Sequence, residues 1–220
     1  MMGKDVIKMN GPLQLSSVTL NLKPSMIRQQ STQTGEQLTA ELELIRAAQA
    51  DPSRFKPLYE QYYESIFRFV YQRTGDEHLT ADLCATVFLK ALQNLHRYEF
   101  RGLPFSAWLY RIALNQVTQH FRQTGKRQFV SIESGRLADM AAQMNEEPQR
   151  WQQAQYKQQL LDVMQSLKPE ELRLVEMRFF EERPFKEIAD ILDISESNAK
   201  VRTYRILERM KKHLLKSLKQ

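Results

Sequence analysis

The stretch from Arg183 to Lys212 constrains the fold most strongly, because two runs of helical periodicity are separated there by one short break. Pro184 suits the first turn of a short helix. The apolar residues of that helix recur at helical spacing: Phe185, Ile188, Ala189, Ile191 and Leu192. A tight connection follows, and Ser195 is a good N-cap for a second helix. The pattern predicts two short helices joined by a turn.

The second helix is expected to begin at Glu196 and to have two unlike faces. One face is expected to pack against the first helix: Ala199, Thr203, Ile206 and Met210. The opposite face offers donors, a ring and a small apolar contact that suit base edges and phosphates: Ser197, Asn198, Lys200, Val201, Tyr204 and Arg205. Together the two helices have the features of a helix-turn-helix, whose second helix enters the major groove of DNA.

Two amphipathic helices with a short turn can also belong to an ordinary helical bundle, and the charge distribution separates these alternatives. The whole chain has a formal net charge of +6. Residues 195–220 alone hold eight Lys and Arg residues against two Glu residues, so the basic excess is local. A local basic excess beside a groove-sized helix favours a DNA partner.

Composition limits the other functions open to this chain. No run of about 18 apolar residues is present, so membrane insertion is not expected. Cys84 is the single cysteine, which excludes an internal disulfide framework, and no signal-peptide pattern begins the chain. A cytoplasmic location is therefore expected. The four histidines are scattered and no nucleotide-binding loop or paired catalytic carboxylates stand out, so we expect no catalytic residues, no metal and no cofactor.

Helical periodicity divides the chain into four parts. Residues 1–36 lack a sustained period and are expected to form a disordered arm. Residues 37–123 predict an N-terminal helical domain, residues 124–153 a flexible polar linker, and residues 154–216 a C-terminal domain that contains the helix-turn-helix. The expected fold class is all-α, with two small helical domains joined by a flexible linker.

The N-terminal domain is expected to contain helices near residues 37–51, 52–73, 76–95 and 106–122. Asp76 is expected to cap the third helix and Ser106 the fourth. Aromatic rings and an arginine lie in and around the loop between these two helices: Tyr98, Phe100, Arg101, Phe105, Trp108 and Tyr110. Such rings can stack on unpaired bases, or they can close the end of the bundle.

Several motifs, in this order and spacing, resemble the extracytoplasmic-function (ECF) group of bacterial sigma factors, the promoter-recognition subunits of RNA polymerase. They are Phe55-x-x-Leu-Tyr-x-x-Tyr-Tyr, Thr80-Ala-Asp-Leu-x-x-x-Val-Phe-Leu-Lys-Ala-Leu, Phe100-Arg-Gly with Ala107-Trp-Leu-Tyr-Arg-Ile-Ala-x-Asn, and Glu187-Ile-Ala with Lys200-x-Arg and Arg205. The resemblance covers roughly residues 44–214. It implies an N-terminal domain that opens and reads the minus-ten promoter element, and a C-terminal domain that reads the minus-thirty-five element as duplex.

The resemblance also implies roles for individual residues. The minus-ten reader would comprise Arg101, Gly102, Leu103, Phe105, Trp108, Arg111 and Asn115, and the exposed face of the last helix would read the minus-thirty-five element. Asp82 and Thr86 would contact core RNA polymerase, whose largest subunit offers its clamp and whose second-largest subunit offers its flap. Promoter DNA and an anti-sigma factor are the other implied partners.

Two departures from the family pattern affect these expectations. Ala85 and Thr86 stand where a Gln-acid pair is common, which weakens the clamp contact and leaves Asp82 as its best candidate. Leu207 stands where an arginine is common, so one phosphate contact is expected to be missing.

The alternative function is a stand-alone helix-turn-helix regulator, which would bind its site as a dimer and leave the aromatic loop unexplained.

Overall fold

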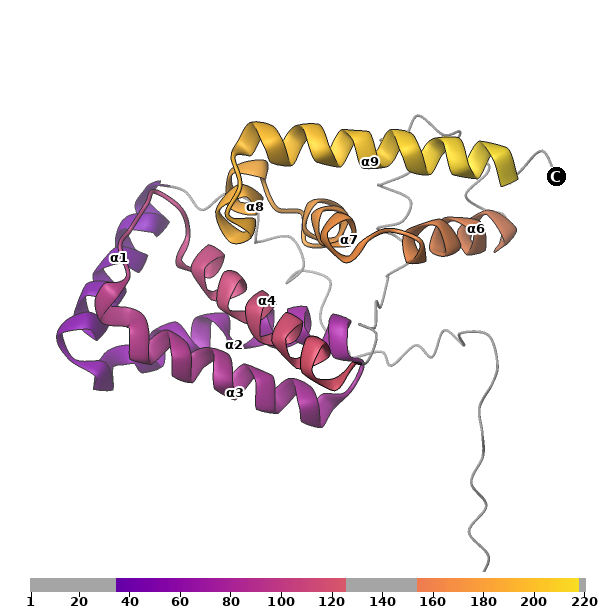
Figure 1. The fold of residues 1–220 in the computed structure, drawn as a ribbon. Coiled ribbons are helices and arrows are strands. Elements are labelled where there is room, and N and C mark those ends of the chain that lie inside the picture. Colours follow the sequence, from indigo (N-terminus) through magenta and orange to yellow (C-terminus); the bar gives the residue numbers. More distant parts are fainter. Residues whose placement is uncertain (1–34, 126–153, 218–220) are drawn as a thin grey trace, which may run out of the picture.

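The computed structural model describes residues 35–125 and 154–217, and within these residues every regular element is helical. Figure 1 shows the helices in two groups, joined by a segment that lies outside the described residues. The all-α fold class with two helical domains is thus confirmed. The expected N-terminal arm and linker fall largely on residues 1–34 and 126–153, outside the described part. No helix of the described residues is long and apolar enough to cross a membrane.

The first group contains four α-helices, with short helical turns before α2 and after α3: α1 (Gly35–Ala50), η2 (Pro52–Phe55), α2 (Lys56–Thr74), α3 (Glu77–Asn94), η3 (Leu95–Arg97) and α4 (Phe105–Thr124). The expected helix at 52–73 is therefore divided, with a 3₁₀ turn at its start. Gly75 ends α2 in the left-handed region, with φ of 64°. The Asp76 carboxylate accepts a hydrogen bond from the Leu79 N–H at 2.9 Å, as expected for the cap of α3.

The start of α4 differs from the expectation. Pro104 occupies the N-cap position, and Ser106 lies one residue inside the first turn. The side chain that satisfies the first backbone donor of this helix comes from a distant element, because the Glu41 carboxylate accepts from the Phe105 N–H at 2.9 Å. The prediction of Ser106 as N-cap was wrong because a long-range acceptor replaces the local one.

The second group consists of α6 (Ala154–Gln165), α7 (Pro169–Val175), the π-helical turn η5 (Glu176–Phe180), α8 (Phe185–Leu192) and α9 (Glu196–Ser217). The helices α8 and α9 form the expected helix-turn-helix. The Ser195 hydroxyl accepts from the Asn198 N–H at 3.2 Å, which confirms its role as cap. Asp193 ends α8 in the left-handed region, with φ of 55°. The stripe expected to face inward is buried: Ala199, Thr203, Ile206 and Met210.

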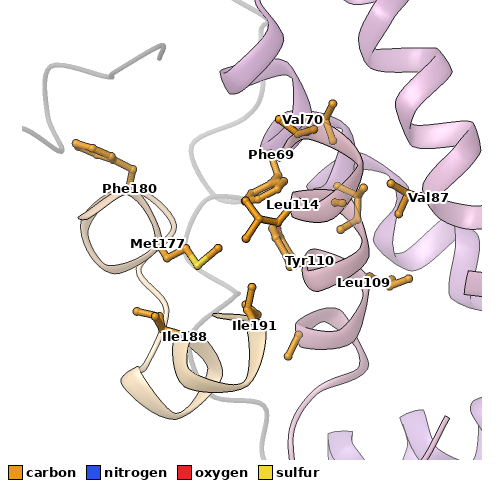
Figure 2. Packing of buried hydrophobic residues seen from close by; sticks show 14 of the residues in the cluster. Phe69, Val70, Val87, Leu109, Tyr110, Leu114, Met177, Phe180, Ile188 and Ile191 are labelled. Atoms are coloured by element: carbon orange, nitrogen blue, oxygen red, sulfur yellow. The ribbon is translucent and has the colours of Figure 1, made fainter. Parts of the chain in front are cut away.

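The two groups of helices contact each other directly through α4 and α8, and their buried apolar residues form one continuous cluster. In Figure 2, Met177 and Ile191 of the second group point toward Tyr110 and Leu114 of α4. All four of these side chains are at most 4% exposed. Composition and helical periodicity predicted two domains on a flexible linker. They did not predict the contact between α4 and α8, because neither composition nor periodicity carries information about contacts between distant segments.

Candidate nucleic-acid interface

The exposed face of α9 presents the residues expected to read duplex DNA. Val201 is 47% exposed and Tyr204 is 54% exposed, whereas Ala199 and Thr203 on the same helix are fully buried. Ser197, Asn198, Lys200 and Arg205 are exposed as well. Burial of one stripe holds the helix in place, so the other stripe is available to a groove.

Leu207 lies on the buried side of α9 and is 4% exposed. A side chain at this position therefore belongs to the hydrophobic core and does not face a phosphate. The absence of a phosphate contact at this position stays a prediction. Nearby, the Arg209 guanidinium lies 2.8 Å from the Glu171 carboxylate of α7 and so helps hold α9 on its neighbours.

The loop before α4 presents a second candidate surface. Arg101 and Gly102 are exposed at its tip, where Gly102 adopts φ of 68°, a conformation that favours glycine. Beside the loop lies a pocket of about 110 Å³, lined by Arg97, Tyr98, Glu99, Arg101, Leu103, Pro104, Ala107, Trp108, Arg111 and Asp190. Rings and guanidinium groups around a small pocket suit a base and its phosphate. Asn115 is exposed further along α4.

Phe105 differs from the expectation for a residue that contacts bases. Its side chain is fully buried, and its ring lies 5.1 Å from Tyr98, 5.3 Å from Trp108 and 6.0 Å from Tyr62, measured between centroids. A ring enclosed in this way supports the loop from beneath and offers no face to a base. Trp108 remains half-buried and lines the pocket, so it combines the packing role with an accessible surface.

Two side chains of α1 hold this loop at both of its ends, and the sequence analysis did not identify them. The Gln49 amide donates to the carbonyls of Leu95 and Tyr98, each at 2.9 Å. The Glu41 carboxylate, 3% exposed, accepts from the Phe105 N–H and from the Tyr62 hydroxyl. One sequence signal was available, because Glu41 lies at helical spacing with the buried residues Ile45 and Ala48, where an acid needs a partner.

We expect Glu41→Gln to destabilise the chain by about 1 kcal/mol, because a neutral amide keeps the shape but loses the charge-assisted hydrogen bonds. Urea unfolding followed by circular dichroism measures this change. The matched control is Glu43→Gln on the exposed side of the same helix, for which a change within about 0.5 kcal/mol is expected. Equal effects of the two substitutions would show that Glu41 does not support the loop.

A buried group of charges joins the two domains. Arg73 of α2 lies 2.9 Å from Glu176 and 3.4 Å from Glu181, and all three side chains are at most 5% exposed. Burial raises the pKa of Glu176 above its usual value, and the nearby Glu181 charge acts in the same direction, while Arg73 opposes it. Arg183 pairs with Glu187 at 2.6 Å, and its guanidinium lies 3.5 Å from the centre of the Tyr110 ring.

The candidate minus-ten surface takes part in this contact between domains. Arg111 of α4 lies 2.9 Å from the Asp190 carboxylate of α8 and also donates to the Asp190 carbonyl. The Lys186 ammonium lies 3.4 Å from the carbonyl of Gly102 at the loop tip. Three interface guanidinium groups nevertheless keep a buried Nε without a hydrogen-bond partner among the described residues, those of Arg73, Arg111 and Arg183.

The expected polymerase-binding residues lie on the outer side of α3. Asp82 and Ala85 are exposed and Thr86 is half-buried, with its hydroxyl donating to the Asp82 carbonyl at 2.9 Å. Leu89, one turn further on, is 55% exposed. The face therefore combines one carboxylate with apolar area, which is typical of a protein-binding surface.

Cys84 lies on the opposite, buried side of this helix, and burial raises the pKa of its thiol to about 12.

Taken together, the helix-turn-helix and the pocket lined by rings and guanidinium groups are features of a helical DNA-binding protein. Comparison with known families agrees: residues 58–127 match Sigma-70 region 2 and residues 157–210 match Sigma-70, region 4. The RNA polymerase sigma factor YlaC of Bacillus subtilis is 30% identical over 162 residues, which cover 73% of this chain and 91% of that protein. The chain belongs to the ECF sigma factors of RNA polymerase.

Two further comparisons extend this result. The ECF RNA polymerase sigma factor BldN of Streptomyces coelicolor is 30% identical over 166 residues, and the match spans 74% of this chain but only 62% of BldN. The solved structure of CnrH in complex with the cytosolic domain of CnrY shares the fold, with a TM-score of 0.53 and 18% identity, covering 81% of this chain and 98% of that one. The matched families and relatives are RNA polymerase sigma factors, so the interpretation as a stand-alone regulator is not favoured.

Proposed function

We propose that this sigma factor binds core RNA polymerase through the outer face of α3 and directs it to promoters that it reads at two separate places. The exposed face of α9 reads the minus-thirty-five element as duplex. The loop residues Arg101, Gly102 and Leu103, with Trp108, Arg111 and Asn115, hold the unpaired bases of the minus-ten element. Phe105 supports that loop from the core.

The observation that supports this proposal is the presence of two chemically different surfaces on one chain, the exposed face of α9 and the pocket beside the loop before α4. A rigid helix with exposed donors suits the edges of paired bases. A small pocket with rings and guanidinium groups suits a base that has left its stack. Capture of unstacked bases makes DNA opening a consequence of binding, so no hydrolysis by this chain is required, and it acts without a catalytic site of its own.

The face of α3 that carries Asp82 and Thr86, with the exposed Leu89 one turn further on, is the proposed contact with the clamp of the largest polymerase subunit. The C-terminal domain is the proposed contact with the flap of the second-largest subunit. The proposed location is the cytoplasm, where core polymerase and promoter DNA are found. An anti-sigma factor is a further proposed partner, which would control access to these surfaces.

Transcription from a promoter library with purified core polymerase, with and without this protein, tests the proposal. We expect initiation that depends on the added protein and on two conserved sequence elements in the active promoters. Tight duplex binding by the protein alone, without any initiation by core polymerase, would overturn the proposal in favour of a stand-alone regulator. The same experiment identifies the promoter sequence.

A further inference from the structure

The minus-ten surface of the described structure is occupied by the protein itself. Asp190 of α8 lines the pocket beside the loop, and its carboxylate pairs with Arg111 at 2.9 Å. Lys186, on the same helix, contacts the loop tip at the Gly102 carbonyl. Arg111 is thus held by an acidic oxygen at the place where the proposed function requires a DNA contact.

The chemistry of this contact imitates that of a nucleic acid. An arginine that pairs with a carboxylate uses the same donors with which it would pair with a phosphate. The arrangement places one negative group against Arg111 in a pocket that also has Arg97 and Arg101 in its lining. The Asp190 carboxylate and a DNA phosphate would therefore use the same Arg111 donors, and they cannot do so at the same time.

The rest of the interface shows how α8 is held in this position. Met177 and Ile191 point toward Tyr110 and Leu114 (Figure 2), and Arg73 pairs across the interface with Glu176 and Glu181. Arg73, Arg111 and Arg183 each have a buried Nε with no hydrogen-bond partner among the described residues.

We propose that α8 and the minus-ten strand compete for one surface, so that the minus-ten reader becomes available only when the two domains separate. This inference rests on the proposed function, since it assigns Arg111 and the pocket to DNA. The competing partner is a segment of the same chain, and the alternative occupant is single-stranded DNA.

The test uses the full chain with donor and acceptor dyes attached at Gln93→Cys and Gln165→Cys, both exposed positions in different domains. The buried Cys84 thiol remains unlabelled, since its pKa is raised to about 12. A 12-nucleotide single-stranded DNA of mixed sequence is the probe, and its binding is followed by fluorescence anisotropy. We expect energy transfer to fall in the same titration in which anisotropy rises. Unchanged energy transfer at saturating DNA would overturn the competition.

Substitution of the competing carboxylate gives a second measurement. Asp190→Asn is expected to tighten binding of this DNA about 3- to 10-fold, and the control Asp193→Asn, which removes the same charge at the exposed end of α8, is expected to change it less than 2-fold. The Arg111→Ala variant is expected to lower energy transfer without tightening DNA binding. Equal effects of the two Asp substitutions would overturn the inference.

Failure of this inference and failure of the proposed function give different results. If the wild-type chain initiates transcription with core polymerase but energy transfer is unchanged on DNA binding, the proposed competition between α8 and DNA is overturned. The proposed function as a sigma factor then still stands. Absence of initiation by the wild-type chain and every variant removes the proposed function, whatever the energy transfer shows.

Discussion

The Arg73→Met substitution is expected to shift the chain from the closed form, in which α4 contacts α8, to an extended one. Arg73 is the buried partner of Glu176 and Glu181, and removing one member of such a group leaves uncompensated carboxylates at a cost of about 3–5 kcal/mol. Because both carboxylates belong to the second domain, separation of the domains returns them to water. Small-angle X-ray scattering should therefore show a larger radius of gyration, with little change in helical content by circular dichroism.

The control for this prediction is Arg54→Met, which removes the same charge at an exposed site. Arg54 has a 69% exposed side chain and a surface pair with Asp51 at 3.7 Å, so its loss is expected to change neither the radius of gyration nor the helical content. Adding Glu176→Gln to Arg73→Met should restore part of the closed form, since one buried charge is removed. An unchanged radius of gyration in Arg73→Met would show that this ion pair does not hold the domains together.

The Arg205→Ala substitution is expected to weaken binding to the minus-thirty-five element by about 1–3 kcal/mol, a loss of roughly 5- to 150-fold in affinity. Arg205 is exposed on the face of α9 that carries Val201 and Tyr204, and a guanidinium there can donate two hydrogen bonds to one guanine. Binding of holoenzyme to promoter fragments with each base of the element changed in turn measures both affinity and specificity. The loss should be confined to fragments that retain the base Arg205 contacts.

The matched substitution Lys212→Ala removes an exposed cation further along the same helix. It is expected to weaken binding nearly uniformly across the promoter variants and to reduce the salt dependence of binding, as for a phosphate contact. If Arg205→Ala also acted uniformly across the variants, Arg205 would be a phosphate contact and its assignment to a base would be lost.

The features that could be predicted from the sequence are those fixed by neighbouring residues. The helix-turn-helix followed from the spacing of Ala199, Thr203 and Ile206 and from the Ser195 cap, since these interactions span one or two turns of helix. The Asp76 cap of α3 was predicted for the same reason. The residues on the exposed face of α9 could also be predicted, because a helix that buries one stripe of residues must expose the residues of the opposite stripe.

The features that could not be predicted depend on contacts between distant segments. Arg73 and Glu176 are 103 positions apart, and nothing in the local pattern of either residue indicates the other. Phe105 was expected to contact bases because it lies in an aromatic loop, yet three surrounding rings enclose it. Ser106 had the local properties of a cap, but Glu41, 64 positions before Phe105, supplies the acceptor.

The position of α1 has a consequence for dissecting the protein into fragments. The match to Sigma-70 region 2 begins at Leu58, whereas the two side chains that hold the loop, Glu41 and Gln49, precede it. A fragment trimmed to the matched region would keep every residue of the minus-ten reader and lose the supports at both ends of its loop. A fragment for studying promoter opening should therefore include α1, which begins at Gly35.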